Sequence, residues 1–103
     1  MSMDVQKIEG LLGMAQRAGK IVSGDLAVEK AVASGQAAAV IMATDASERT
    51  KTSVLRATER KGIPVYSLFT KEMLGQCLGK EYRAVAALID KGFAKTLEER
   101  VRI

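Results

Sequence analysis

The sequence predicts an α/β protein with one domain, built as a three-layer α/β/α sandwich around a mixed sheet of about four strands. Three observations support this prediction. The chain has 103 residues, which suits one hydrophobic core, so we expect a single domain over residues 1–103. Segments with apolar residues three or four positions apart alternate with short apolar runs. Two of those runs are apolar almost throughout, which is typical of strands covered on both faces.

The first half of the chain is predicted to form helix, strand, helix and strand in turn. Residues 4–17 have apolar side chains at helical spacing, and Gly19 follows as a helix terminator. Residues 21–23 are a short strand candidate, and residues 25–34 form a second helical pattern that ends before a glycine. Residues 38–44 are a continuous apolar run, so we expect them to be the central strand.

The second half continues the alternation. Asp45 follows the central strand as a capping residue, and Glu48 stands three positions on, which predicts a helix over residues 45–61. After it, a β-rich run leads to Thr70, a second capping residue. The remaining predicted elements are a strand over residues 64–69, a helix over 71–78, a strand over 83–89 and a helix over 92–100. The complete order is therefore αβαβαβαβα.

The composition excludes several classes of chemistry. The chain has no His and a single cysteine, Cys77, so it cannot form a Ser–His triad, a Cys–His dyad or a thiolate–imidazole zinc cluster. Asp45 and Asp90 each follow a predicted strand, where an enzyme could hold a metal or a general base. Each also has a simpler expected role as a helix cap. We therefore expect no enzyme activity, no cofactor and no metal.

The charge balance favours a polyanionic partner only mildly. Sixteen Lys and Arg face twelve Asp and Glu, for a formal net charge of +4. The helix predicted over residues 45–61 carries several cations that are either a solvated face or a secondary phosphate contact. They are Arg49, Lys51, Arg56, Arg60 and Lys61.

Targeting signals are not recognisable. Residues 1–10 carry two carboxylates and no apolar leader segment, and the longest uncharged apolar run is too short to span a bilayer. A lone cysteine suits a reducing compartment. We therefore expect a cytoplasmic protein without a membrane partner.

The first candidate binding segment is the turn that leads into the second predicted helix. It contains Lys20, Ser23, Gly24 and Asp25, and Lys30 follows about a turn and a half into the helix. Exposed amides at a helix N-terminus bind anions, and a lysine on the same rim adds positive charge. In the simpler interpretation Gly24 permits the turn, Asp25 caps the helix and Lys30 is an ordinary surface charge.

The second candidate segment precedes the last predicted strand. It comprises Leu74 and Gly75, and then Leu78, Gly79, Lys80, Glu81, Tyr82 and Arg83. Arginine and tyrosine side chains can stack on unpaired bases. In the simpler interpretation the segment is a polar turn, with Tyr82 packed on the edge of the core.

Fragments along nearly the whole chain, from about residue 8 to residue 97, carry a family resemblance. They are residues 24–32, the strand ending in Ala43-Thr44-Asp45, the Gly-Ile-Pro-Val-Tyr run at 62–66, Leu74-Gly75 with Gly79, and residues 79–85 and 90–94. In order and spacing they resemble the kink-turn-binding ribosomal protein superfamily, which includes the large-subunit seven-Ae and thirty-e proteins. The two last fragments look most like its bacterial YlxQ-type homologues.

The resemblance implies an α/β/α fold and a non-enzymatic RNA-binding protein of the ribosomal or ribonucleoprotein type, connected with translation. Family members bind sharply bent RNA helices that carry tandem sheared G·A pairs beside a bulge. By this likeness, residues 24–30 enter the groove at the G·A pairs, and residues 79–83 cover flipped bulge nucleotides. Lys20, Lys30, Lys80 and Arg83 are then expected near phosphates, with Tyr82 available for stacking.

Two departures from the family pattern leave an alternative open. Typical binders have Asn-Glu where this chain has Leu26-Ala27, and their bulge-contacting loop is apolar, whereas residues 80–83 are polar. Affinity is then expected to depend on phosphates and stacking, or the preferred RNA to differ from a standard kink-turn. The alternative is a protein-interaction adaptor on the same fold that has lost specific RNA recognition. In either case we expect a monomer.

Overall fold

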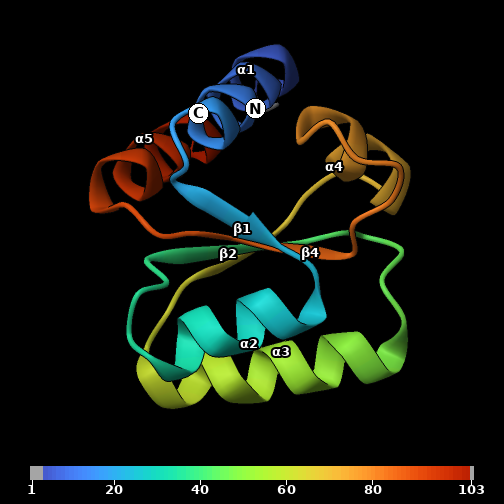
Figure 1. Cartoon of the computed structure of the whole chain (residues 1–103), viewed down its shortest axis with the longest axis vertical. Coiled ribbons are helices and arrows are strands. Elements are labelled where there is room, and N and C mark those ends of the chain that lie inside the picture. The colour runs from blue at the N-terminus through green and yellow to red at the C-terminus, as the bar shows by residue number, and fades with distance from the viewer. Residues whose placement is uncertain (1–3, 103) are drawn as a thin grey trace.

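The computed structural model describes residues 4–102, which form five helices and four strands in the predicted order (Figure 1). The elements are α1 (Val5–Arg17), β1 (Ile21–Ser23), α2 (Asp25–Ala33), β2 (Ala39–Met42), α3 (Glu48–Lys61), β3 (Val65–Ser67), α4 (Lys71–Cys77), β4 (Val85–Leu88) and α5 (Lys91–Val101). The order αβαβαβαβα is thereby confirmed.

The four strands form one mixed sheet in the order β1-β4-β2-β3. Strand β4 runs antiparallel to both neighbours, with Ser23 opposite Ala86 and Met42 opposite Val85, while β2 and β3 are parallel. Strands β1, β2 and β3 therefore end, and β4 begins, at the same edge, here named the carboxyl edge. The connections that lead into α2, α3, α4 and β4 gather there.

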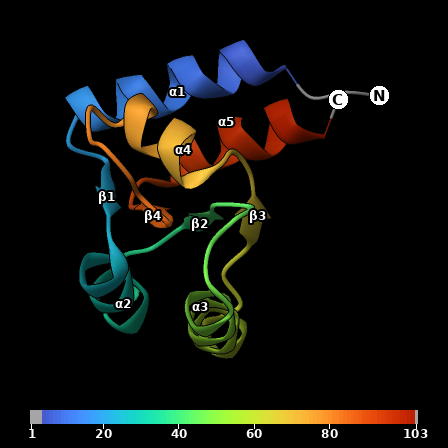
Figure 2. The ribbon, with the colours of Figure 1, turned by 90° about the vertical axis from the view of Figure 1, so that its right-hand side faces the viewer.

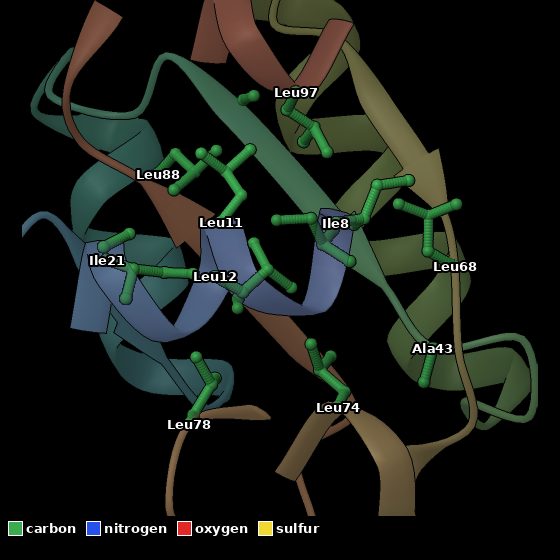
Figure 3. Close-up of a cluster of buried hydrophobic side chains, with 14 residues drawn as sticks. Ile8, Leu11, Leu12, Ile21, Ala43, Leu68, Leu74, Leu78, Leu88 and Leu97 are labelled. Carbon is green, nitrogen blue, oxygen red and sulfur yellow. The ribbon is translucent and has the colours of Figure 1, made fainter. Parts of the chain in front are cut away.

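Helices cover both faces of the sheet, as predicted. Helices α1, α4 and α5 lie on one face, and α2 and α3 on the other (Figure 2). Alternate strand residues supply the two cores: Leu88 of β4 lies on the side of α1, near Leu11 (Figure 3), and its neighbour Ala87 belongs to the core on the side of α2 and α3. This explains why β2 and β4 are apolar at every position, since all eight of their residues are buried.

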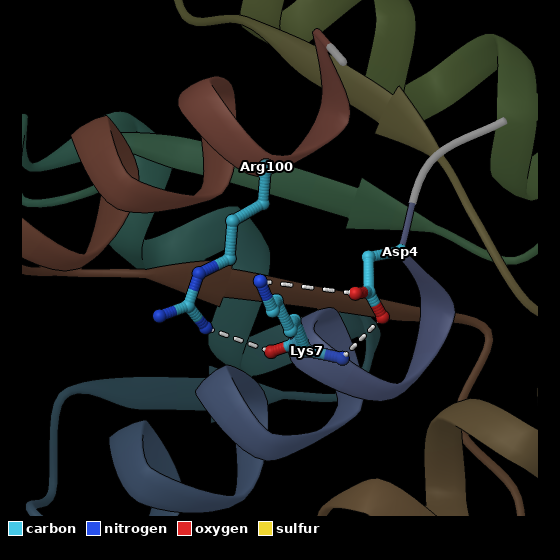
Figure 4. Close-up of polar contacts among 3 residues, drawn as sticks. All are labelled: Asp4, Lys7 and Arg100. Atoms are coloured by element: carbon cyan, nitrogen blue, oxygen red, sulfur yellow. Dashed lines mark hydrogen bonds and ion pairs between the residues drawn. The ribbon is translucent and has the colours of Figure 1, made fainter. Parts of the chain in front are cut away.

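Polar contacts tie the outer helices α1 and α5 together. Asp4 caps α1, because its carboxylate accepts a hydrogen bond from the amide of Lys7 at 3.1 Å. The Arg100 guanidinium, in the last turn of α5, donates to the Lys7 carbonyl at 2.8 Å (Figure 4). The last turn of α5 is thus held against the first turn of α1.

The predicted start of the third helix is wrong. Helix α3 begins at Glu48, and Ser47 caps it by accepting from the Thr50 amide at 3.2 Å. The Asp45 carboxylate instead accepts from the amide of Lys71, the first residue of α4, at 2.8 Å. Asp45 therefore stabilises the start of a different helix, because the end of β2 lies beside the end of β3 at the carboxyl edge.

Strand boundaries are also shorter than predicted. The strand expected over residues 83–89 spans only Val85–Leu88. The Arg83 amide donates to the Lys71 carbonyl at 3.0 Å rather than to a neighbouring strand. This segment therefore belongs to the connection at the carboxyl edge.

Candidate nucleic-acid interface

The sheet brings the two candidate segments together, although sixty residues separate Ser23 from Arg83 in sequence. Because β1 and β4 are antiparallel, the turn after β1 lies beside the loop before β4, and the Gly24 amide donates to the Val85 carbonyl at 3.0 Å. The Arg83 Nε atom also donates to Ser23 Oγ at 3.0 Å. Residues 23–27 and 79–83 therefore form one continuous surface, here named the two-loop rim.

The turn into α2 depends on a glycine. Gly24 has φ +96°, a conformation that strains residues with a side chain. It is also the N-cap of α2 and offers no side chain to the first amides of the helix. The expectation that Asp25 caps the helix is wrong, because Asp25 is the first helical residue. The start of α2 thus presents amides without a side-chain cap, as an anion-binding helix end does.

The loop at residues 79–83 lies directly on helix α4, and Gly75 permits this approach. The Lys80 amide donates to the Gly75 carbonyl at 2.8 Å. A Cβ atom at Gly75 would lie 2.6 Å from the Glu81 carbonyl oxygen and 2.9 Å from the Tyr82 nitrogen. The sequence places Gly75 in the second candidate segment but predicts no positioning role for it. A glycine inside a helix, where alanine is about 1 kcal/mol more favourable, was the available signal for its positioning role.

The side chains of this loop differ in exposure and in the hydrogen bonds that they make. Tyr82 is 59% exposed and does not pack on the core, contrary to the simpler interpretation. Lys80 and Glu81 are exposed, while Arg83 is half-buried and also donates from Nη1 to the Tyr82 carbonyl at 2.8 Å. The Arg83 guanidinium therefore uses two of its five N–H groups inside the protein, one of which joins the two segments, and keeps the other three available for an anion.

The remaining predicted site residues lie at different distances from the rim. Leu26 is 65% exposed in the first turn of α2, and Ala27 is half-buried. Lys30 is exposed further along α2, where it lines a hollow with Arg60. Lys20 lies at the other end of β1, where its carbonyl accepts from the Ile89 amide at 2.9 Å. A three-residue strand, about 10 Å long, separates Lys20 from the rim.

Other candidate groups have structural surroundings. Asp90 caps α5 by accepting from the Phe93 amide at 3.0 Å, as the simpler interpretation predicted. Burial, followed by the negative charge of Glu9, raises the pKa of the half-buried Cys77 thiol.

Across residues 4–102, no cluster of three or more acidic, cysteine or histidine side chains is arranged to hold a metal ion. No helix in this described part is long and apolar enough to cross a membrane.

Two known proteins are similar in sequence to this chain over most of its length. RNA-binding protein YlxQ of Enterococcus faecium is 35% identical over 93% of this chain and 92% of its own length. RNA-binding protein YlxQ of Bacillus subtilis is 38% identical over 84% of this chain and 87% of its own.

Solved structures share the fold. A Bacillus halodurans protein described as of unknown function has a TM-score of 0.90 at 36% identity, covering 94% of this chain and 98% of that one. The 15.5 kD RNA binding protein of Giardia lamblia has a TM-score of 0.79 at 23% identity, covering 94% of this chain and 83% of that one, and supports the fold alone. The model of one family matches residues 6–98. The chain therefore belongs to the ribosomal protein L7Ae/L30e/S12e/Gadd45 family.

Proposed function

We propose that this protein is a non-enzymatic RNA-binding protein that recognises structured, kink-turn-like RNA through the two-loop rim. Family membership and the RNA-binding relatives support an RNA partner. The single observation that carries the site is the hydrogen bond from Arg83 to Ser23, which joins the two candidate segments into one surface. The protein acts as a cytoplasmic monomer on ribosomal RNA or on the RNA of another ribonucleoprotein.

Each part of the rim has a role that its chemistry suits. The start of α2 offers amides to a phosphate, and Gly24 leaves room for the backbone to approach. The exposed Tyr82 ring stacks on an unpaired base, while Lys80 adds positive charge beside it. Leu26 presents an apolar side chain, so recognition depends less on hydrogen bonds to base edges than on phosphates, stacking and RNA shape.

A salt-dependent titration tests the proposal. The probes are a kink-turn RNA, the same RNA without its tandem G·A pairs, and a plain hairpin of equal length. We expect the kink-turn to bind at least about tenfold more tightly than the others, a difference of about 1.4 kcal/mol. Equal and weak binding of all three RNAs, lost as salt rises, would contradict bent-RNA recognition.

Variants assign the contacts. Lys30→Ala is expected to weaken binding and to lower the magnitude of the salt slope by about one, as for the loss of one phosphate contact. Lys95→Ala, on α5 across the sheet, removes the same charge and serves as the control. An unchanged salt slope and affinity in Lys30→Ala would exclude Lys30 from the site.

Tyr82→Ala is expected to weaken binding by about 1–3 kcal/mol, whereas Tyr82→Phe keeps the stacking ring.

The exposure of Leu26 favours the second candidate function, a protein-interaction adaptor. At 65% exposure its side chain suits an apolar protein contact. Co-purification of a protein partner after nuclease treatment, lost in Leu26→Ser, together with equal weak binding of all three RNAs, would support the adaptor over the RNA-binding function.

A further inference from the structure

Helix α3 carries three arginines on one narrow stripe. Arg49, Arg56 and Arg60 are all exposed. Successive helical residues are rotated by about 100°, so positions separated by seven and four residues point within about 40° of one another. The carboxylates of Glu48 and Glu59 point about 90° away around the same helix. The three cations therefore share one line along the helix that no carboxylate interrupts, with Glu48 at the border of the same surface, whereas a merely solvated helix surface usually mixes the two signs along one line.

The stripe borders a groove between α2 and α3 that begins at the two-loop rim. A hollow of about 440 Å³ is lined by Asp25 of the rim, by Glu29 further along α2, and by Ser47 and Arg49 at the start of α3. A second hollow of about 420 Å³ is lined by Lys30 of α2 and by Arg60. The stripe thus starts beside the first turn of α2 and continues away from the carboxyl edge along the outside of the molecule.

The arginines of the stripe make no close ion pair within the described residues. Within the described chain, ion pairs of 4.0 Å or less join Lys7 to Asp4 and Lys51 to Glu48, and none involves an arginine of the stripe. The hydroxyl groups of Thr52 and Ser53 share a shallow depression with the three arginines: Glu48, Arg49, Thr52, Ser53, Arg56, Ala57 and Arg60 line it. Guanidinium and hydroxyl groups are donors that commonly contact phosphate oxygens.

We propose that this arginine stripe binds the phosphate backbone of a duplex stem that continues from the RNA held at the rim. The proposal rests on the proposed function and extends it to a second contact surface. From Arg49 to Arg60 the helix rises about 16 Å. A nucleic-acid duplex presents about ten phosphates over that length, so three arginines in a row can each meet one. Contacts of this kind read the shape of the duplex and not its sequence.

The test varies the length of the stem. Two RNAs share the bent core, one with a flanking stem of about four base pairs and one with about twelve. Arg56→Ala combined with Arg60→Ala removes two stripe cations from exposed helical positions, where alanine is the best helix former. The matched control, Lys91→Ala with Lys95→Ala, removes two exposed cations from α5 on the opposite face.

On the long-stem RNA, the stripe variant is expected to bind about tenfold more weakly than the unaltered protein, with a salt slope smaller by about two. On the short-stem RNA its affinity should stay within about twofold, and the control variant should follow the unaltered protein on both. Equal losses on both RNAs, or a loss no larger than that of the control, would overturn the proposal. Normal binding of the long-stem RNA with loss of an acidic protein partner would also overturn it.

The two proposals fail in different ways. If the unaltered protein prefers the bent core but the stripe variant shows no dependence on stem length, the rim proposal survives and the stripe proposal is overturned. If the unaltered protein ignores the bent core and still binds long stems through the stripe, the function proposed for the rim is overturned instead.

Discussion

Replacement of Gly75 by alanine is the sharpest perturbation that the structure offers. The new Cβ would lie 2.6 Å from the carbonyl oxygen of Glu81 and 2.9 Å from the nitrogen of Tyr82. Both atoms belong to the backbone, so neither can rotate aside as the end of a flexible side chain would. The loop at residues 79–83 must move away from α4, or α4 must shift.

Two opposing contributions set the expected change in stability. Alanine in place of glycine stabilises a helix by about 1 kcal/mol, while overpacking costs about 1–3 kcal/mol. We therefore expect Gly75→Ala to lower the free energy of unfolding by about 0–2 kcal/mol. Gly10 is the matched control, because it is an exposed helical glycine in α1 where a Cβ atom would have no neighbouring atom within 4 Å. There the same substitution should stabilise the protein by about 0.5–1 kcal/mol.

Chemical denaturation of the two variants measures the cost of the contact between residue 75 and the loop at residues 79–83. Both variants gain the helix propensity of alanine, so the difference between their unfolding free energies isolates the steric cost, which we expect to be about 1–3 kcal/mol. A titration with the bent RNA then measures its functional consequence. Displacing the loop that carries Tyr82 should weaken binding by about fivefold or more, equivalent to about 1 kcal/mol, whereas Gly10→Ala should bind within about twofold of the unaltered protein.

The stability measurement can refute this reasoning directly. If Gly75→Ala gains as much stability as Gly10→Ala, the loop does not lie against α4. If stability falls but RNA affinity is unchanged, the contact exists and the loop is not part of the RNA site.

Three further predictions concern stability. Asp45→Ala should lower the free energy of unfolding by about 0.5–1.5 kcal/mol through loss of the hydrogen bond to the Lys71 amide, with Asp45→Asn affected less in the same denaturation experiment. Leu12→Ala should lower the free energy of unfolding by about 2–5 kcal/mol in urea denaturation, because this side chain of α1 is fully buried against the sheet. A loss below about 1 kcal/mol would contradict its place in the core. Burial, followed by the charge of Glu9, raises the pKa of the Cys77 thiol, so its contribution to stability is present below the thiol's ordinary pKa and is lost as pH rises through the raised value. As pH rises above the ordinary thiol pKa of about 8.5, stability should therefore fall more in the unaltered protein than in Cys77→Ala, and equal losses would exclude this effect.

The prediction of the layers succeeded because it depended on local patterns. Apolar spacing distinguished helices from strands, and the unbroken apolar runs identified the two central strands, β2 and β4, that both helical layers cover. The start of α3 was predicted wrongly because Asp45 and Ser47 are both capable of capping and stand two residues apart. In the structure Asp45 accepts a hydrogen bond from the amide of Lys71, which is distant in sequence, and Ser47 is the residue that caps α3.

The candidate site was found in part. Residue types predict both segments of the rim. The tertiary structure separates Lys20 from them, because Lys20 precedes β1 and the rim begins where β1 ends. The stripe on α3 was noted only as a set of cations. Helical periodicity alone places Arg49, Arg56 and Arg60 on one face, and only the tertiary structure places that face beside the groove between α2 and α3.

The sequence by itself determined the alternation of helices and strands, the two-sided burial of the sheet and the absence of histidine chemistry, because each depends on residue types and their local spacing. Only the tertiary structure decided that Ser23 meets Arg83 and that Gly75 meets the loop after α4. Every strand offers the same backbone donors and acceptors, so local sequence does not specify which strands pair or in which register. The packing of both cores makes that choice, and with it the surface that we propose binds RNA.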